Sequence, residues 1–184
     1  MQGIDVLVDE HKNIVRFHVF LRKICCDIIE GAKVDVQLLR ECLEFAKNYA
    51  DKYHHGKEEE ILFKIMIEQS GDVGQKLIKN GMLVEHDLAR YYLDELESSL
   101  NAYERNSGTE YKYGVIVSAG SYAELLKRHV EKENKVVYTF AQRELSPEDL
   151  EKVSKLGLER DNEEHQAAIK EKYLKWLDEK TGSC

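Results

Sequence analysis

Two histidine–glutamate pairs at helical spacing constrain the fold of this chain more than any other feature. His54 precedes Glu58 by four residues, and His129 precedes Glu133 by four residues as well. Residues four apart lie on one face of an α-helix, one turn above each other. Each pair therefore brings an imidazole nitrogen and a carboxylate to one point. Two such pairs predict a metal site with carboxylate ligands inside a helical bundle.

Helical periodicity extends along almost the whole chain. Apolar residues recur at the spacing of an amphipathic helix, and no segment shows the alternating pattern of a strand. Asp35 is a suitable N-cap for the second helix, and Ser146 followed by Pro147 is a suitable start for the last. The expected helices cover residues 4–29, 36–68, 75–105, 111–143 and 146–180.

The loops between these helices are short, so neighbouring helices are expected to run antiparallel. The sequence therefore predicts an all-α fold, an up-down antiparallel four-helix bundle with an additional C-terminal helix. We expect a single domain over residues 1–184, with the bundle in residues 1–145 and the additional helix in residues 146–180.

The helical register places four histidines at one height in this bundle. His11 and His54 each lie about 21 residues from the turn between the first and second helices. His86 and His129 each lie about 21 residues from the turn between the third and fourth helices. Because an α-helix rises about 1.5 Å per residue, the members of each pair are level to within about one turn.

The turn near Gly71 links these two pairs of histidines. Glu58 lies about 13 residues before this turn and His86 about 15 residues after it, so these two also share a level. The layer predicted from all these intervals contains His11, His54, Glu58, His86, His129 and Glu133. Such a set of nitrogen and oxygen donors suits iron or manganese better than a structural zinc ion.

Composition limits the classes of partner. The formal net charge of −8 argues against nucleic-acid binding. No N-terminal run resembles a signal peptide and no apolar stretch is long enough for a bilayer, so we expect a cytoplasmic protein with no membrane partner. Cys25, Cys26, Cys42 and Cys184 form no C-x-x-C pair and are expected to be free thiols. A disulfide from Cys25 or Cys26 to Cys42 is the geometric alternative.

Four segments of the chain, residues 8–11, 54–59, 84–90 and 129–134, resemble the haemerythrin-like, HHE cation-binding family. The likeness covers residues 1–145, and the last helix is similar to the C-terminal helix of longer bacterial and archaeal members. It implies a four-helix bundle around two non-haem iron ions, with manganese as the alternative metal and a bridging oxide or hydroxide. The ligands that it implies are His11, His54, Glu58, His86, His129 and Glu133.

The chain departs from the oxygen-carrying members of this family at three positions. Carriers have a second histidine one turn after the third-helix histidine, where this chain has Arg90. They have an aspartate five residues after the fourth-helix histidine, whereas Glu133 follows His129 by four. They mostly have phenylalanine where this chain has His55. The first and third differences favour sensing, iron handling or redox chemistry over simple oxygen carriage.

The number of protein ligands determines how many positions stay open on the metals. Two six-coordinate ions have about twelve positions. Four imidazoles, two bridging carboxylates and a bridging oxide or hydroxide fill about ten of them, which leaves about two. A fifth protein ligand would leave about one. The ligand count therefore separates a binder with a single open position from a more reactive centre.

Three further histidines are candidates for additional ligation. His165 in the last helix reaches the height of the layer, but a helix packed outside the bundle favours a solvated or capping role. His18 lies about 10 Å from His11 along the same helix, which favours a core or supporting role. His55 points about 100° away from His54 around the helix, so we do not expect it to be a ligand.

Other residues near the motifs have simpler expected roles. Glu10 and Glu85 are expected on solvated helix faces, and Glu59 and Glu60 either on such faces or in support of the site. Arg90 is expected to pair with a carboxylate near the site or to extend to solvent. The tyrosines expected in the core or an interface, one of which could hydrogen-bond a ligand oxygen, include Tyr53, Tyr91, Tyr122 and Tyr138.

Three functions fit this site. The first, which we favour, is a di-iron protein that binds or senses dioxygen or a related small ligand, with any signal passing to an external partner. The second is an enzyme that reduces peroxide, nitric oxide or dioxygen with electrons from an external donor, because the sequence has no flavin, haem or iron–sulfur motif. The third is an iron store or donor. The sequence leaves open whether the protein is an enzyme.

Overall fold

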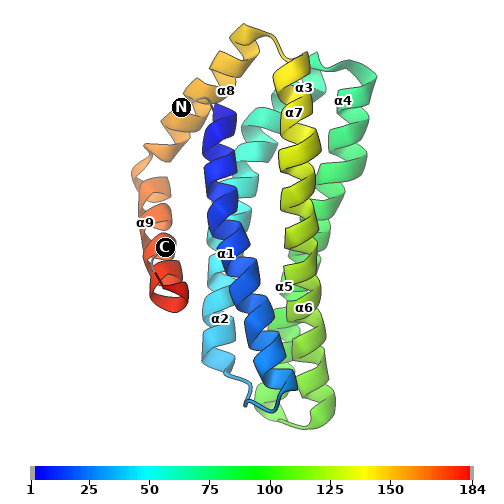
Figure 1. Cartoon of the computed structure of the whole chain (residues 1–184), viewed down its shortest axis with the longest axis vertical. Helices are drawn as coiled ribbons and strands as arrows, with labels where there is room; N and C mark the ends of the chain where they lie inside the picture. The colour runs from blue at the N-terminus through cyan, green and yellow to red at the C-terminus, as the bar shows by residue number, and fades with distance from the viewer. Residues whose placement is uncertain (1–2, 183–184) are drawn as a thin grey trace.

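A computed structural model describes residues 3–182 of the chain (Figure 1). Nearly all of these residues are helical and none of them forms a strand, so the prediction of an all-α protein is confirmed. The segments labelled η are π-helical, with backbone hydrogen bonds that span five residues and turns wider than those of an α-helix.

Long helical rods pack side by side along the molecule (Figure 1). The first rod is α1 (Gly3–Ile29). The second rod joins α2 (Val36–Phe45), η1 (Ala46–His55), η2 (Glu58–Leu62) and α3 (Phe63–Gln69). The third rod joins α4 (Gly71–Leu77), η3 (Ile78–Met82) and α5 (Leu83–Arg105). The fourth rod joins α6 (Thr109–Lys132), η4 (Glu133–Val137) and α7 (Tyr138–Glu144).

The ends of the rods follow from local chemistry. The carboxylate of Asp35 accepts a hydrogen bond from the backbone N–H of Leu38 at 3.0 Å, which confirms the predicted cap of the second rod. Gly31 has a φ of 107° after the first rod, and Gly71 has a φ of 61° between the second and third. Both turns need a left-handed conformation that glycine adopts without steric cost.

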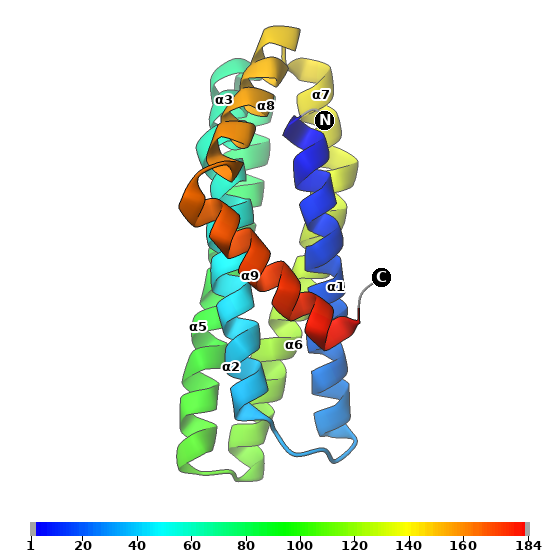
Figure 2. The ribbon, with the colours of Figure 1, turned by 90° about the vertical axis from the view of Figure 1, so that its left-hand side faces the viewer.

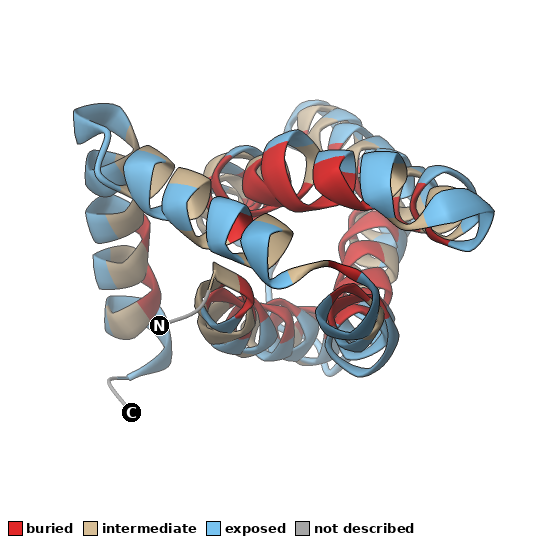
Figure 3. Cartoon of the chain, turned by 90° about the horizontal axis from the view of Figure 1, so that it is seen from above, coloured by how far each residue is buried: buried red, intermediate tan, exposed pale blue. Residues whose placement is uncertain are grey.

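Two apolar clusters fill the space between the rods, whose buried faces turn inward (Figure 3). In each rod, buried histidine or glutamate residues separate the residues of one cluster from those of the other. In the first rod, for example, His11 lies between Leu7 of one cluster and Ile14 of the other. The bundle therefore contains one buried polar layer with apolar packing on both sides.

The C-terminal segment corrects the prediction of one additional helix over residues 146–180. It forms two helices, α8 (Pro147–Asp161) and α9 (Glu164–Thr181). Ser146 accepts a hydrogen bond from the N–H of Asp149 at 3.1 Å, as expected for the predicted start.

The break between α8 and α9 has a packing reason. α8 packs on α1 and η2, whereas α9 crosses α1 and η1 obliquely (Figure 2). Val153 of α8 belongs to one apolar cluster, and Tyr173 and Leu177 of α9 belong to the other. The chain changes direction where the backbone of Glu163 is extended, so each helix buries its own apolar face.

The structure bears on the predicted state of the cysteines and on the prediction that no segment crosses a membrane. Cys25, Cys26 and Cys42 are free thiols, so the alternative of a disulfide among them is wrong. Cys184 lies outside the described residues. Across residues 3–182, no helix has both the length and the apolar character needed to cross a lipid bilayer.

Candidate metal centre

The buried polar layer brings together the six residues that the sequence predicts as ligands. Their exposed fractions lie between 0% and 3%, and they come from all four rods. They are His11, His54, Glu58, His86, His129 and Glu133.

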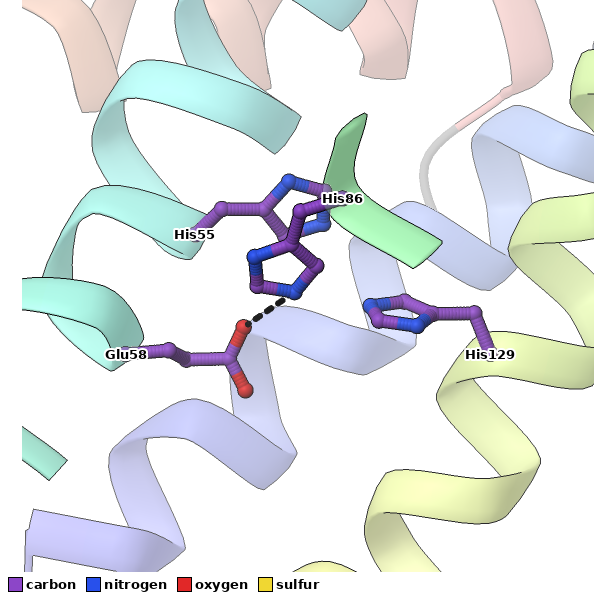
Figure 4. A group of neighbouring side chains, drawn as sticks. All are labelled: His55, Glu58, His86 and His129. Atoms are coloured by element: carbon purple, nitrogen blue, oxygen red, sulfur yellow. Dashed lines mark ion pairs between the residues drawn. The ribbon is translucent and has the colours of Figure 1, made fainter. Parts of the chain in front are cut away.

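Two adjoining groups of possible ligand atoms lie in this layer, and within each group the atoms are within 4.8 Å of one another. The group that we name the histidine-rich pocket consists of His55, Glu58, His86 and His129 (Figure 4). The group that we name the carboxylate-rich pocket consists of His11, His54, Glu58 and Glu133. Because Glu58 belongs to both, one carboxylate can serve two adjacent cations.

The second carboxylate also faces both pockets. An oxygen of Glu133 lies 3.2 Å from Nε2 of His11 and 3.2 Å from Nε2 of His129. Its other oxygen lies 3.7 Å from Nε2 of His86. Glu133 and Glu58 therefore occupy equivalent central positions between histidines of opposite pockets.

Most of the inward atoms of the layer lack hydrogen-bond partners. Nε2 of His54, His86 and His129, one oxygen of Glu58 and both oxygens of Glu133 are buried without a partner. Leaving buried polar atoms unsatisfied is costly, and native structures rarely do so without a compensating ligand. Cations bound by these nitrogen and oxygen atoms would satisfy all of them at once, so the donor set fits a pair of metal ions.

The outward nitrogen of each predicted histidine ligand is held by an acceptor on another rod. For example, Nδ1 of His54 lies 2.9 Å from a carboxylate oxygen of Glu10. An acceptor without hydrogens requires Nδ1 to carry the proton, which leaves the lone pair on Nε2 directed inward. The other three contacts join His86 to Glu59 at 2.6 Å, His129 to Glu85 at 3.0 Å, and His11 to Asn134 at 2.8 Å.

These four acceptors connect the rods in a closed order, from the first to the second, the second to the third, the third to the fourth, and the fourth back to the first. Each acceptor is the chain neighbour of a predicted ligand. The expected solvated roles of Glu10 and Glu85 are therefore wrong, because each is turned toward the histidine of the adjacent rod. The supporting role considered for Glu59 matches its contact with His86, whereas Glu60 is exposed and pairs with Arg160.

The direction of His55 also corrects the sequence prediction. Its side chain does not point away from the site: it is 1% exposed, and its ring stacks on that of His86 with centroids 3.9 Å apart (Figure 4). Its Nδ1 lies 3.3 Å from a carboxylate oxygen of Asp51. The reason is the π-helical segment η1, whose wide turns rotate the end of the segment relative to an α-helix. Consequently, His54 and His55 both face the interior.

Arg90 pairs with carboxylates around the site and does not extend freely to solvent. Its guanidinium lies 2.8 Å from Asp51 and 2.7 Å from Glu59. These are the acceptors of His55 and His86, so Arg90 joins the supports of two histidines in the same pocket. The pKa of Asp51 falls to about 2: burial alone would raise it, but the contacts with His55 and Arg90 outweigh burial.

Tyr138 is the tyrosine that points into the layer. Its hydroxyl donates a hydrogen bond to Glu58 at 2.6 Å and lies 3.3 Å from Nε2 of His11. Burial, together with the charge of Glu58, raises the pKa of Tyr138 well above its usual value, so the hydroxyl keeps its proton. Among the other tyrosines, Tyr53 and Tyr122 are buried as expected, but Tyr91 is exposed.

Burial controls protonation in the layer. The pKa of Glu58 is raised well above its usual value by burial and by the charge of Glu133. Burial opposes ionisation of Glu133 too, but the contacts with His129, His11 and His86 lower its pKa well below the usual range.

Two of the imidazoles are affected in the direction that favours metal binding. Burial lowers the pKa of His54 well below its usual value and that of His55 to about 3. Because metals bind neutral imidazole, these two side chains need not lose a proton at neutral pH before they can be ligands. Burial would lower the pKa of His86 as well, but the contacts with Glu133 and Glu59 outweigh burial and raise it.

Two of the histidines considered as additional ligands lie outside both pockets. His165 is exposed on α9, beside a surface cleft between that helix and η1. His18 is buried in α1 but belongs to neither group of ligand atoms. Their expected roles away from the metals agree with these positions.

Comparison with known protein families gives a match over most of the chain. The family model described as hemerythrin HHE cation binding domain matches residues 2–141, which include every residue of both pockets and end before α8. No match was found among curated proteins. Because the matched range covers most of its length, the chain belongs to the hemerythrin HHE cation-binding family.

Proposed function

We propose that this protein binds two non-haem iron ions and uses them to bind or sense dioxygen or a related small ligand. The observation that carries the proposal is the pair of adjoining pockets that share Glu58 in one buried layer. Histidine nitrogens and carboxylate oxygens suit iron, with manganese as the alternative. In this proposal the ligands are His11, His54, Glu58, His86, His129 and Glu133, with His55 as a seventh.

The seventh ligand changes the number of open positions. Five imidazoles, two bridging carboxylates and a bridging oxide or hydroxide fill about eleven of the roughly twelve positions on two six-coordinate ions. About one position then stays open. His55 therefore supports a centre that accepts one small ligand at a time, although Arg90 occupies the position where carriers have their additional histidine.

The surroundings of the layer suit such a ligand. Iron ions, when bound, supply the reversible electron transfer that dioxygen binding requires. The chain itself excludes water by placing an apolar cluster on each side of the layer, and Tyr138 holds its proton on a hydroxyl oxygen that lies 2.6 Å from an oxygen of Glu58. The rods are proposed to form the up-down antiparallel bundle of the family, which delivers ligands from four directions.

Metal analysis followed by rapid mixing tests this proposal. After anaerobic loading with ferrous iron and removal of excess metal, we expect about two irons per chain. Mixing with dioxygen should produce a new absorption band that is lost when dioxygen is removed. One iron per chain, or a firm preference for zinc, would contradict the di-iron site. Catalytic turnover would favour the redox enzyme, and iron transfer to an acceptor protein would favour the donor.

A further inference from the structure

The end of α8 packs against the part of the second rod that carries three candidate ligands. Residues 52–60 include His54, His55 and Glu58, and the last two residues of α8, Arg160 and Asp161, both contact this segment. The family match ends at residue 141, so these contacts come from outside the matched region.

Asp161 contacts two buried side chains of this segment. One of its oxygens accepts a hydrogen bond from the Tyr53 hydroxyl at 2.9 Å and lies 2.7 Å from the ammonium of Lys57. Tyr53 is 0% exposed and Lys57 is 3% exposed. The ammonium also lies over the Tyr53 ring, 3.9 Å from its centroid. A buried ammonium is tolerated only with such partners.

The same ammonium connects Asp161 to a candidate ligand. Lys57 forms a second ion pair with Glu10, which is 3% exposed. The other oxygen of Glu10 holds Nδ1 of His54 at 2.9 Å. Lys57 therefore pairs with two carboxylates at once. The strength of its pair with Glu10 determines how much negative charge remains on Glu10 to accept the hydrogen bond from Nδ1 of His54.

Arg160 holds the backbone of the same segment. Its guanidinium donates to the carbonyl oxygens of Lys52 at 3.2 Å and Gly56 at 3.3 Å, and it pairs with Glu60. A Cβ atom at Gly56 would lie 2.6 Å from the guanidinium, so the glycine provides room for this contact. Arg160 therefore fixes the backbone on both sides of His54 and His55.

We propose that Arg160 and Asp161, which we name the α8 clamp, are positioning residues for the metal centre. The clamp holds His54, His55 and Glu58 against the ligands of the other rods, so retention of metal depends on a helix outside the matched family region. This inference rests on the proposed metal-binding function. It adds that α8 supports the centre and does more than cover the bundle.

Replacement of single charges tests the clamp. Asp161→Asn keeps the shape of the side chain but removes its charge, so Lys57 binds Glu10 more strongly and weakens the contact between Glu10 and His54. The full-length protein, loaded anaerobically with ferrous iron, is mixed with excess ferrous chelator. We expect release from Asp161→Asn to be about tenfold faster than from the wild type, the lower end of effects seen for residues that support metal ligands. Asp161→Glu should restore most of the retention.

Matched controls lie on the same helix. Glu159 and Lys155 are exposed, so Glu159→Gln and Lys155→Gln remove charges from α8 without touching residues 52–60. Arg160→Gln is expected to accelerate release, whereas the two control variants are expected to match the wild type. Release from Asp161→Asn and Arg160→Gln within about twofold of the wild type would overturn the clamp, since a supporting partner is worth at least about tenfold.

A second measurement needs no metal. In the metal-free chain, the Nδ1–H proton of His54 should give an NMR signal at the high chemical shift typical of a hydrogen-bonded proton. This chemical shift should decrease in Asp161→Asn but not in Glu159→Gln. An unchanged His54 signal in Asp161→Asn would overturn the clamp even if the variant were less stable. If the wild type held no iron, the proposed function would fail, and this signal would still decide whether α8 positions His54.

Discussion

The histidine-rich pocket and the carboxylate-rich pocket share Glu58 but differ in what supports them. The supports of His55 and His86 are Asp51 and Glu59, which line a cleft of about 700 Å³ between α9 and the second rod. The support of His54 in the other pocket is Glu10, which is buried and paired with a buried lysine. One pocket is therefore backed by partly exposed ion pairs. In the other, the support of His54 is a buried ion pair, and that of His11 is the exposed Asn134.

Two buried sites in one layer can thus have supporting residues that differ in their exposure to solvent. Ion pairs at a surface rearrange easily and are screened by salt, whereas a buried pair is held by the cost of separating its charges. We therefore expect the histidine-rich pocket to exchange its metal first.

The largest effect is expected from Glu58, because it belongs to both pockets. Glu58→Gln keeps the shape of the side chain but removes the charge that two cations share, so both metals should be lost. Affinity should fall by more than the roughly 100-fold that removal of a supporting partner can cause. Metal content after gel filtration measures the effect, with Glu68→Gln as the exposed control on the same rod. Retention of metal by Glu58→Gln would refute a shared carboxylate.

Removal of His55 should affect one pocket only. His55→Gln is expected to reduce bound iron from about two ions per chain to about one, because the carboxylate-rich pocket keeps all its donors. His18→Gln is the control, since His18 is a buried histidine outside both pockets. If His55→Gln still held two irons with unchanged affinity, His55 would be a packing residue and the pockets would contain four histidines.

A smaller effect is expected from Arg90. Arg90→Gln removes the cation that joins Asp51 and Glu59, so the two histidines that they hold become more mobile. We expect iron release from the histidine-rich pocket to accelerate by about tenfold or less, with the other pocket unchanged. Biphasic release kinetics would show this directly. Asp87→Asn is the control because Asp87 pairs with Arg90 but holds no histidine. Equal acceleration of both phases would contradict separate access.

The smallest effect concerns the pH dependence of the metal-free chain. Burial lowers the pKa of His55 from 6.5 to about 3, so the unfolded chain binds the proton more readily than the folded chain. The stabilising contribution of neutral His55 is therefore complete above pH 6.5 and is lost as the pH falls toward 3. The melting temperature of the wild type should fall more steeply over this range than that of His55→Gln. Parallel curves would show that His55 is not buried in its neutral form.

The height of the buried polar layer could be predicted from the sequence, but the direction of every side chain could not. Counting residues from each turn uses only the rise per residue, which tolerates an error of one turn. The direction of His55 depends on the hydrogen-bond register of η1, which changes where the turns widen. A signal for this exists, because buried residues recur every four positions from Phe45 through Tyr49 and Tyr53, longer than the 3.6-residue period of an α-helix.

The roles of Glu10 and Glu85 also could not be predicted from the pattern of one helix alone. A residue next to a ligand lies about 100° around the helix, which places it at the boundary with the neighbouring rod. The packing of the two rods determines whether the side chain at that boundary faces solvent or a histidine of the neighbouring rod. The break between α8 and α9 has the same origin, since it depends on which apolar cluster each helix covers.

The closed order of acceptors has a consequence for synthesis of the protein on the ribosome. His11, near the start of the chain, is held by Asn134, which is translated more than a hundred residues later. Until that segment leaves the ribosome, the first imidazole lacks its support, and Glu133 is absent from both neighbouring pockets. We therefore expect nascent chains to capture iron poorly until the fourth rod has emerged. Iron would then be committed only to chains in which all four rods have emerged.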